Sequence, residues 1–317
     1  MEAAGGVPLP GKTEYSWRNI MSMVINHNMM AMNAANNLSN SYGKLSTSVR
    51  RLSSGLRVGT AADDAAGLAI RELMRSDIAA LNQGVRNAND AISMIQTADG
   101  ALGIIDEKLI RMKELSEQAA TGTYTSDQRL IIDSEYQAMA SEITRIANST
   151  DFNGIHLLNG NLSGAKHDGS KLTSAGKLKV HFGSANDSAE DYYYIQIGTS
   201  TASSLGLGNQ ASKTSAGYTI STQSAAQQAL VAVQNAIVSK DQIRASLGSL
   251  QNRLENTISN LRTQSENLQA AESRISDVDV SSEMTEFVRQ QILTQSAVAM
   301  LSQANSLPRM AMQLIGG

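Results

Sequence analysis

Apolar residues recur along most of the chain at alternating steps of three and four. In the N-terminal part, these positions are Leu38, Tyr42, Leu45, Val49, Leu52 and Leu56. This heptad spacing aligns apolar side chains on one face of a helix and predicts packing against another helix. The same rhythm continues through residues 78–112. It predicts a helix over residues 68–120 that is about 75 Å long.

Further helical segments follow on both sides of the chain's middle. The stretch "TGTYTSDQ" (121–128) interrupts the rhythm, and Ser126 or Asp127 is expected to cap the next helix. That helix is expected to end in "NSTDFNGIHLLNG" (148–160). A second seam runs over residues 243–275, and a last helix over residues 281–305 is expected to stop before Pro308.

Residues 161–223 differ from the rest in being rich in Gly, Ser, Thr and Asn. Here "KLKVHF" (177–182) and "DYYYIQIGT" (191–199) are typical of short β-strands. Because the helical seam resumes afterwards, the middle is expected to project from the far end of a rod. The predicted fold is mainly α: a long antiparallel helical bundle or coiled-coil rod built from both chain ends, with a small β-containing domain inserted in the middle.

The stretch "RLSSGLRVGTAADDAAGLAI" (51–70) breaks the helical pattern between two regular segments. It is either a joint in a rod or a catalytic loop. Adjacent residues on a helix point roughly 100° apart, so Asp63 and Asp64 are not expected to share a site there. Capping of the following helix is the favoured interpretation.

The composition excludes several classes of function. Hydrophobic residues make up 41% of the chain but aromatic residues only 4%, which suits aliphatic helix packing. The net charge of −3, without a Lys/Arg cluster, argues against nucleic acid. No apolar run reaches the roughly 18 residues of a membrane span, and no Sec signal pattern is present. The chain has no cysteine, which excludes disulfides and thiolate sites.

No enzyme chemistry is visible in the sequence. The histidines at positions 27, 156, 167 and 181 share no ligand spacing, and neither an HExxH motif nor a phosphate-binding GxxxxGK[ST] loop occurs. We therefore predict no catalysis, no metal and no cofactor.

Residues 23–58 and 281–317 are amphipathic segments that lie beyond the inner rod. To bury their apolar stripes they need each other and further copies of the chain, which predicts folding coupled to assembly. The candidate assembly residues are Leu38, Leu45, Leu52, Leu56, Met284, Phe287, Val288 and Ile292.

Long motifs at both ends resemble a known family. Residues 23–70, beginning "MVINHNMMAMNAANN", resemble the N-terminal signature of bacterial flagellin, and residues 261–315 resemble its C-terminal signature. "FNGIHLLNG" (152–160) and "RASLGSLQNRL" (244–254) are similar to further landmarks of the family.

The resemblance implies a structural subunit that polymerises into the flagellar filament for motility. Residues 21–62 with 276–317 would form inner-tube helices, residues 63–160 with 224–275 a core rod with its spoke, and residues 161–223 a variable exposed insert. One alternative is a hook–filament junction protein. Another is an enzyme or ligand-binding helical protein, such as a flagellin variant with a metalloprotease insert, which the missing HExxH disfavours.

The resemblance also implies partners and a location outside the cell. The chain would be secreted by the flagellar type III apparatus, with an export chaperone on its C-terminal segment and with filament cap and hook-associated proteins at assembly. An animal Toll-like receptor would contact Arg111 and Leu115, four apart on one helix face, together with Glu135. The alternative for these residues is an ordinary solvated helix face.

Residues 1–20 match none of the family's pattern, which begins close to "MSMVINHN". We predict that translation starts at Met21 and that residues 1–20 are a leader that is not part of the native protein.

Overall fold

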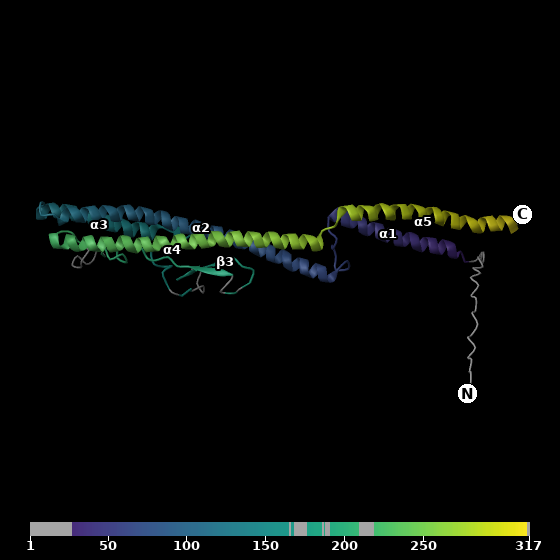
Figure 1. The fold of residues 1–317 in the computed structure, drawn as a ribbon, viewed down its shortest axis with the longest axis horizontal. Helices are drawn as coiled ribbons and strands as arrows, with labels where there is room; N and C mark the ends of the chain where they lie inside the picture. The colour runs from purple at the N-terminus through teal and green to yellow at the C-terminus, as the bar shows by residue number, and fades with distance from the viewer. Residues whose placement is uncertain are drawn as a thin grey trace, which may run out of the picture. The chain divides into compact units, whose positions relative to one another are not determined.

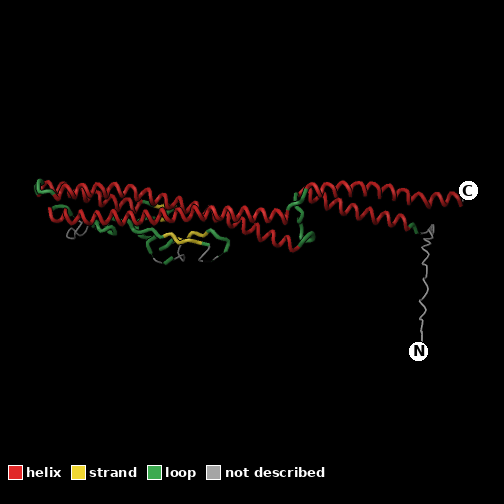
Figure 2. The backbone as a smooth tube through the Cα atoms, in the orientation of Figure 1, coloured by secondary structure: helices red, strands yellow, loops and turns green. Residues whose placement is uncertain are grey.

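The computed structural model describes residues 27–164, 166–167, 176–185, 187, 191–208 and 219–315. The predicted leader and start at Met21 lie outside these residues. The elements are α1 (Met29–Ser54), α2 (Ala65–Ala120), α3 (Ser126–Ser149), β1 (Asp151–Phe152), β2 (Ile155–His156), β3 (Leu178–His181), β4 (Tyr192–Ile195), α4 (Gln223–Ser276) and α5 (Val280–Ile315). Figures 1 and 2 show that long helices dominate, which confirms the mainly α fold.

The chain divides into two compact units. One holds the chain up to Ala65 and from Ser276 onward, and the other runs from Ala66 to Ile275. The first unit therefore consists of α1, α5 and their connecting segments, and we call it the terminal pair. The second unit, which we call the central bundle, contains α2, α3, α4 and the inserted strands.

In the central bundle α2, α3 and α4 run side by side (Figure 1). Ten of the buried positions of α2 follow two heptad series. These are Leu81, Ala88, Ile95, Leu102 and Leu109, and Ala91, Ala98, Ile105, Met112 and Ala119. A matching series on α4 is Ala226, Val233, Lys240, Leu247, Leu254 and Leu261. Knobs at heptad spacing explain why helices of this length pack continuously on mainly aliphatic side chains, with Tyr136 of α3 as a fully buried aromatic residue among them.

One position of the α4 series is charged. Lys240 is 2% exposed, and its ammonium donates to Asp106 at 2.6 Å and to the neighbouring Asp241 at 2.7 Å. A second ion pair joins Arg244 to Asp99 at 2.7 Å, one helical turn further along. A polar group at a seam position fits only one alignment of the two helices, so these pairs favour the observed register of α4 on α2.

The loop between α2 and α3 caps α3 with a residue other than the predicted ones. The side chain of Thr125 accepts from the backbone of Gln128, whose side chain accepts from the backbone N–H of Thr125 in return. This capping box satisfies two backbone donors at once, which neither Ser126 nor Asp127 does at its position inside the helix.

The inserted strands lie along the bundle, and the predicted projection from its far end is wrong. Strands β3 and β4 pair antiparallel, with Val180 opposite Tyr193. A Cβ atom added to Gly84 in α2 would lie 2.0 Å from the carbonyl oxygen of Phe182, so the backbone beyond β3 packs directly on the helix. The side chain of Asn87 donates to the carbonyl of His181 at 2.8 Å. Glycine at position 84 permits this close approach.

In the terminal pair α1 and α5 lie antiparallel, with Asn28 near Ala304 and Arg51 near Glu283. The predicted end of the last helix before Pro308 is wrong, because α5 continues through Pro308 to Ile315. Proline lacks the N–H that would bond the carbonyl four residues earlier. That carbonyl belongs to Ala304, and it accepts from the side-chain amide of Asn28 at 2.8 Å. The partner helix thus supplies the missing donor.

Candidate assembly surfaces

The terminal pair exposes large apolar side chains along both helices. Those at least 44% exposed are Met29, Met30, Met32, Tyr42, Val49, Val280, Met284, Val288, Ile292, Leu293, Val298, Met300, Met310 and Met312. We call them the terminal apolar residues. Soluble monomers seldom expose apolar surface on this scale unless it is an interaction site.

The residues that the terminal pair buries are mostly polar. Within the described part of this unit, Ser48, Ser276, Gln290 and Thr294 are buried, and Val58 and Ala304 are the buried apolar residues. Gln290 donates to Glu286 at 2.6 Å, whereas the Thr294 hydroxyl has no hydrogen-bond partner among the described atoms. Among its described residues the terminal pair therefore buries more polar than apolar side chains completely, and Leu38, Leu45 and Phe287 stay half-buried.

The eight predicted assembly residues divide into two groups. Met284, Val288 and Ile292 are exposed. The other five are half-buried: Leu38, Leu45, Leu52, Leu56 and Phe287. The sequence pattern did not separate these groups, although Met284, Val288 and Ile292 repeat every four residues and so lie on one stripe of α5. Their role in assembly stays a prediction.

The segment after α1 pairs with the segment before α5. Gly55 ends α1 at a φ of 72°, a left-handed conformation that favours glycine. Its carbonyl accepts from Val278 at 3.0 Å, and the N–H of Arg57 donates to Ser276 at 2.6 Å. Leu56 and Asp277 form an isolated antiparallel bridge between these bonds. The segment after α1 and the segment before α5 are thus held together by backbone hydrogen bonds.

Asp63 closes a turn in the segment after α1 and does not cap α2, whereas capping by Asp64, which directly precedes α2, stays a prediction. Its carboxylate accepts from the N–H of Thr60 at 3.0 Å and from the Thr60 hydroxyl at 2.8 Å. Arg50 of α1 donates to its other oxygen at 2.7 Å. The bonds from Thr60, with the Arg50 guanidinium, hold the pKa of Asp63 below its usual range. These contacts support the interpretation of the stretch as a joint.

The predicted receptor residues differ sharply in exposure. Arg111 lies about half exposed on α2 and donates to Glu135 of α3 at 2.9 Å and to Glu114 at 2.9 Å. These carboxylates, Glu114 first, raise the pKa of the Arg111 guanidinium. Leu115 is 1% exposed and belongs to the hydrophobic core, so the expectation that it stands on an exposed face with Arg111 is wrong.

The burial of Leu115 has a simple cause. At this end of the bundle α2 packs against α3 as well as α4, which widens the buried arc of the helix beyond one heptad seam (Figure 1). The Arg111–Glu135 ion pair lies at the edge of that contact. The spacing in the sequence shows that Arg111 and Leu115 are neighbours on the helix. It does not show that Leu115 is buried in the core while Arg111 stays about half exposed.

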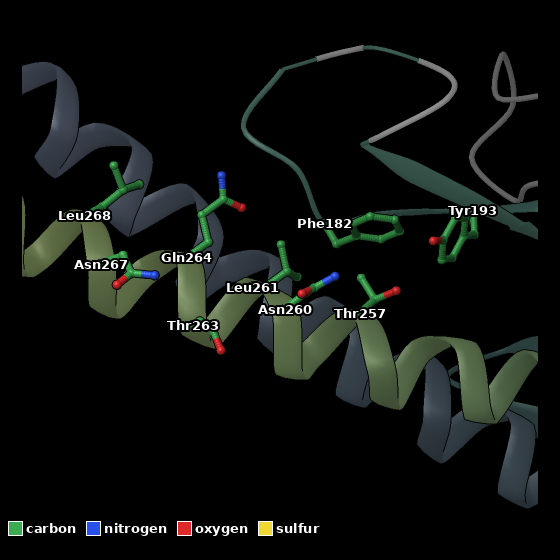
Figure 3. Close-up of a pocket in the computed structure, with 9 residues that line it drawn as sticks. All are labelled: Phe182, Tyr193, Thr257, Asn260, Leu261, Thr263, Gln264, Asn267 and Leu268. Carbon is green, nitrogen blue, oxygen red and sulfur yellow. The ribbon is translucent and has the colours of Figure 1, made fainter.

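A shallow groove of about 590 Å³ lies between α4 and the inserted strands (Figure 3). Phe182 and Tyr193 meet edge to face with ring centroids 4.7 Å apart, and the Arg253 guanidinium lies 4.3 Å from the centre of the Tyr193 ring. The helix side of the groove carries Thr257, Asn260, Leu261, Thr263, Gln264, Asn267 and Leu268. These lining residues include no carboxylate or histidine, so they supply no acid–base pair. No motif or spacing in the sequence points to this groove.

Two kinds of site are not found in the described residues. They contain no group of three or more His, Cys, Asp or Glu side chains placed to hold a metal ion. Within the same part of the chain, no helix is both long enough and apolar enough to span a membrane.

Both ends of the chain match family models. The model for the bacterial flagellin N-terminal helical region matches residues 25–163, and the model for the C-terminal helical region matches residues 230–315. The chain is 40% identical over 293 residues to the flagellar filament 33 kDa core protein of Treponema phagedenis, covering 92% of this chain and 100% of that protein. The chain belongs to the bacterial flagellin family.

Other similar proteins agree with this membership. A flagellin of Halalkalibacterium halodurans is 39% identical over 299 residues, covering 92% of this chain and 100% of that flagellin. A flagellar hook-associated protein of Vibrio parahaemolyticus shares the fold at 14% identity, with a TM-score of 0.51, covering 68% of this chain and 100% of that chain.

The resemblance predicted from the sequence is therefore confirmed, and the chain is a structural subunit of the flagellar filament. At 14% identity, the likeness to the hook-associated protein concerns the fold alone and gives the junction-protein alternative no support. Flagellins are structural proteins that polymerise with copies of themselves, and the filament that they form is extracellular.

Proposed function

We propose that the terminal pair is the surface through which copies of this filament subunit polymerise, and that α1 and α5 become fully ordered only in the filament. In this arrangement the terminal pair forms the inner tube, the central bundle forms the outer shell and residues 51–70 form the joint between them. The observation that carries the proposal is that the pair buries Gln290 and Thr294 while it exposes Met284, Val288 and Ile292.

The energetics support coupling between order and assembly. A buried Thr294 hydroxyl without a partner costs about 1–3 kcal/mol, which offsets part of the stabilisation that the half-buried apolar side chains of the α1–α5 contact provide. Each terminal apolar residue that a neighbouring copy covers would contribute about 1 kcal/mol, roughly half the value for full burial, because these side chains are only about half exposed. Because such helices depend on packing more than on intrinsic propensity, neighbouring copies supply most of the stability of α1 and α5.

Single charges on the terminal apolar residues test the proposal. Ile292 is 57% exposed in α5, so Ile292→Asp should leave the central bundle folded, with an unchanged thermal unfolding temperature, and should abolish sedimentable filament. Tyr194→Asp, at a 42% exposed position in the insert, is the matched control and should polymerise normally. Normal polymerisation of Ile292→Asp would refute the assignment of α5.

Partners before and during assembly follow from the same surface. We propose secretion through the flagellar type III apparatus, with an export chaperone that covers the exposed stripe of α5 until the cap and hook-associated proteins receive the subunit. Before assembly no neighbouring copy covers this apolar stripe, so a chaperone is needed to cover it in the cell. Calorimetry with the purified chaperone should give binding that is lost in Val288→Asp and kept in Tyr194→Asp. Binding unaffected by Val288→Asp would contradict this placement.

We also propose that an animal Toll-like receptor contacts the monomer at Arg111 and Glu135. Their half-exposed side chains from two different helices support this role, since the pair could exchange its mutual ion pair for charge-assisted bonds to a partner. Leu115 is part of the core, and its truncation is expected to cost about 2–5 kcal/mol of bundle stability. A Leu115→Ala variant would therefore report on folding.

A reporter-cell assay of purified monomer tests the receptor contact. The Arg111→Ala, Glu135→Ala double variant should lose most of the response. The matched control is Arg145→Ala, which removes an exposed arginine paired with Glu142 at 2.6 Å elsewhere on α3, and it should respond like wild type. A double variant as potent as the control would remove both residues from the contact.

A further inference from the structure

The methionines of this chain divide between the two units by exposure. In the terminal pair every described methionine is at least 44% exposed: Met29, Met30, Met32, Met284, Met300, Met310 and Met312. In the central bundle Met94 and Met112 are at most 2% exposed, and Met74 and Met139 are half-buried. Thioether sulfur is therefore accessible on α1 and α5 of the terminal pair and much less accessible in the central bundle.

Accessible thioethers react with two-electron oxidants such as hydrogen peroxide. A sulfur lone pair attacks one peroxide oxygen, an S–O bond forms and the O–O bond breaks. The sulfur is oxidised by two electrons, and the peroxide is reduced to water as a proton moves to the leaving hydroxide. The product sulfoxide is polar where the thioether was apolar. Since the chain has no cysteine, no thiol in the same subunit competes for the oxidant.

We propose that the exposed methionines of the terminal pair are an oxidation-sensitive modification site that controls whether the subunit can assemble. A sulfoxide at Met284 or Met300 would have to be desolvated where a neighbouring copy now meets an apolar side chain. Loss of the burial contribution of one such half-exposed methionine weakens association roughly fivefold. Several sulfoxides on one subunit would multiply the effect and exclude the subunit from the filament.

This inference rests on the proposed function of the terminal pair, and it predicts an order of events. In the free subunit the methionines of α1 and α5 meet the oxidant, whereas in the filament neighbouring copies cover them. Oxidation before assembly therefore blocks polymerisation, while assembled filament resists the same dose. Methionine sulfoxide reductases convert the sulfoxide back to the thioether, so the block is reversible.

The experiment treats purified full-length subunit with hydrogen peroxide, removes the peroxide with catalase and then induces polymerisation. Peptide mass spectrometry should find added oxygen first on the terminal-pair methionines and last on Met94 and Met112. The sedimentable fraction should fall at least tenfold and return after treatment with the reductases. Filament treated first and then dissociated should carry few sulfoxides on these methionines.

Two variants separate the site from general oxidative damage. One replaces all seven exposed methionines by leucine, a change of similar volume, and its sedimentable fraction after peroxide treatment should equal its own untreated fraction. The matched control, Met74→Leu with Met139→Leu, should stay as sensitive as wild type. Circular dichroism of each variant checks that it is folded, and the order in which peptides are oxidised gives a reading that does not depend on polymerisation.

Each outcome has one meaning. If untreated wild type fails to polymerise through the terminal pair, the proposed function falls. If untreated subunit polymerises and the oxidised subunit polymerises equally well, only the oxidation site is overturned. Equal oxidation of the central and terminal methionines, or equal sensitivity of the seven-leucine variant, would also overturn it.

Discussion

Asn28 uses both ends of its side-chain amide to connect the two terminal helices. Its oxygen accepts from the N–H of Ala31 at 3.0 Å and so caps α1. Its nitrogen donates to the Ala304 carbonyl, which Pro308 leaves without an intrahelical donor. A proline inside a helix is normally costly, and here Asn28, which lies 276 positions before Ala304 in sequence, offsets part of that cost.

A double-mutant cycle tests this role. Asn28→Asp keeps the capping oxygen but loses the donor, so it should destabilise the filament by about 1 kcal/mol per subunit, measured through the depolymerisation temperature. In a Pro308→Ala background, residue 308 regains its own N–H for the Ala304 carbonyl, and the effect of Asn28→Asp should shrink. An equal effect in both backgrounds would contradict the proposed compensation.

Asn28 also shows which feature of the last helix could not be predicted from the sequence. Proline rules predicted that the last helix ends before Pro308, because a local rule counts only donors in the same helix. The donor comes from α1, and no local pattern reveals it. The exposure of Leu115 was predicted wrongly for a related reason. Heptad spacing locates the contact face of a helix, but the width of that face depends on how many helices pack around α2.

At the scale of elements, the position of the inserted strands depends on one glycine. The backbone of Phe182 approaches α2 at Gly84, where any side chain would collide with a carbonyl oxygen. Asn87 bonds the adjacent His181 carbonyl, and Tyr193 packs beneath Arg253 of α4. A close backbone approach, a hydrogen bond and a ring contact together hold strands β3 and β4 along the bundle.

Gly84→Ala tests this docking. The new methyl group would overlap the Phe182 carbonyl, so the strands should shift or detach at a cost of about 1–3 kcal/mol. Limited proteolysis should then cut within residues 161–222 faster than in wild type. Gly100→Ala on the same helix meets nothing within 4 Å and should raise helix stability by about 0.5–1 kcal/mol. Equal proteolysis of the two variants would contradict close docking at Gly84.

Most elements of this chain were predictable because their signals are local. Heptad spacing predicted the helix over 68–120, and the structure has α2 at Ala65–Ala120. The alternating runs predicted both strands of the insert. The placement of those strands was not predictable, because Gly84 and Phe182 lie far apart in sequence and neither has a spacing that points to the other.

At the scale of the whole molecule, the two units differ in how their surfaces and interiors are composed. The central bundle has a mainly aliphatic interior with heptad order, and among its described residues it buries one ammonium, that of Lys240. The terminal pair buries polar side chains and exposes apolar ones within the residues described. A subunit with this distribution can fold its bundle alone and still depend on other copies to complete its terminal helices.

Hydrogen exchange on monomer and on filament tests this dependence most directly. Amides of the buried heptad positions in α2 and α4 should be protected in both states. Amides of α1 and α5 should exchange rapidly in the monomer and become protected by at least about 100-fold in the filament, which corresponds to roughly 3 kcal/mol of added local stability. Strong and equal protection of α1 and α5 in monomer and filament would contradict the account.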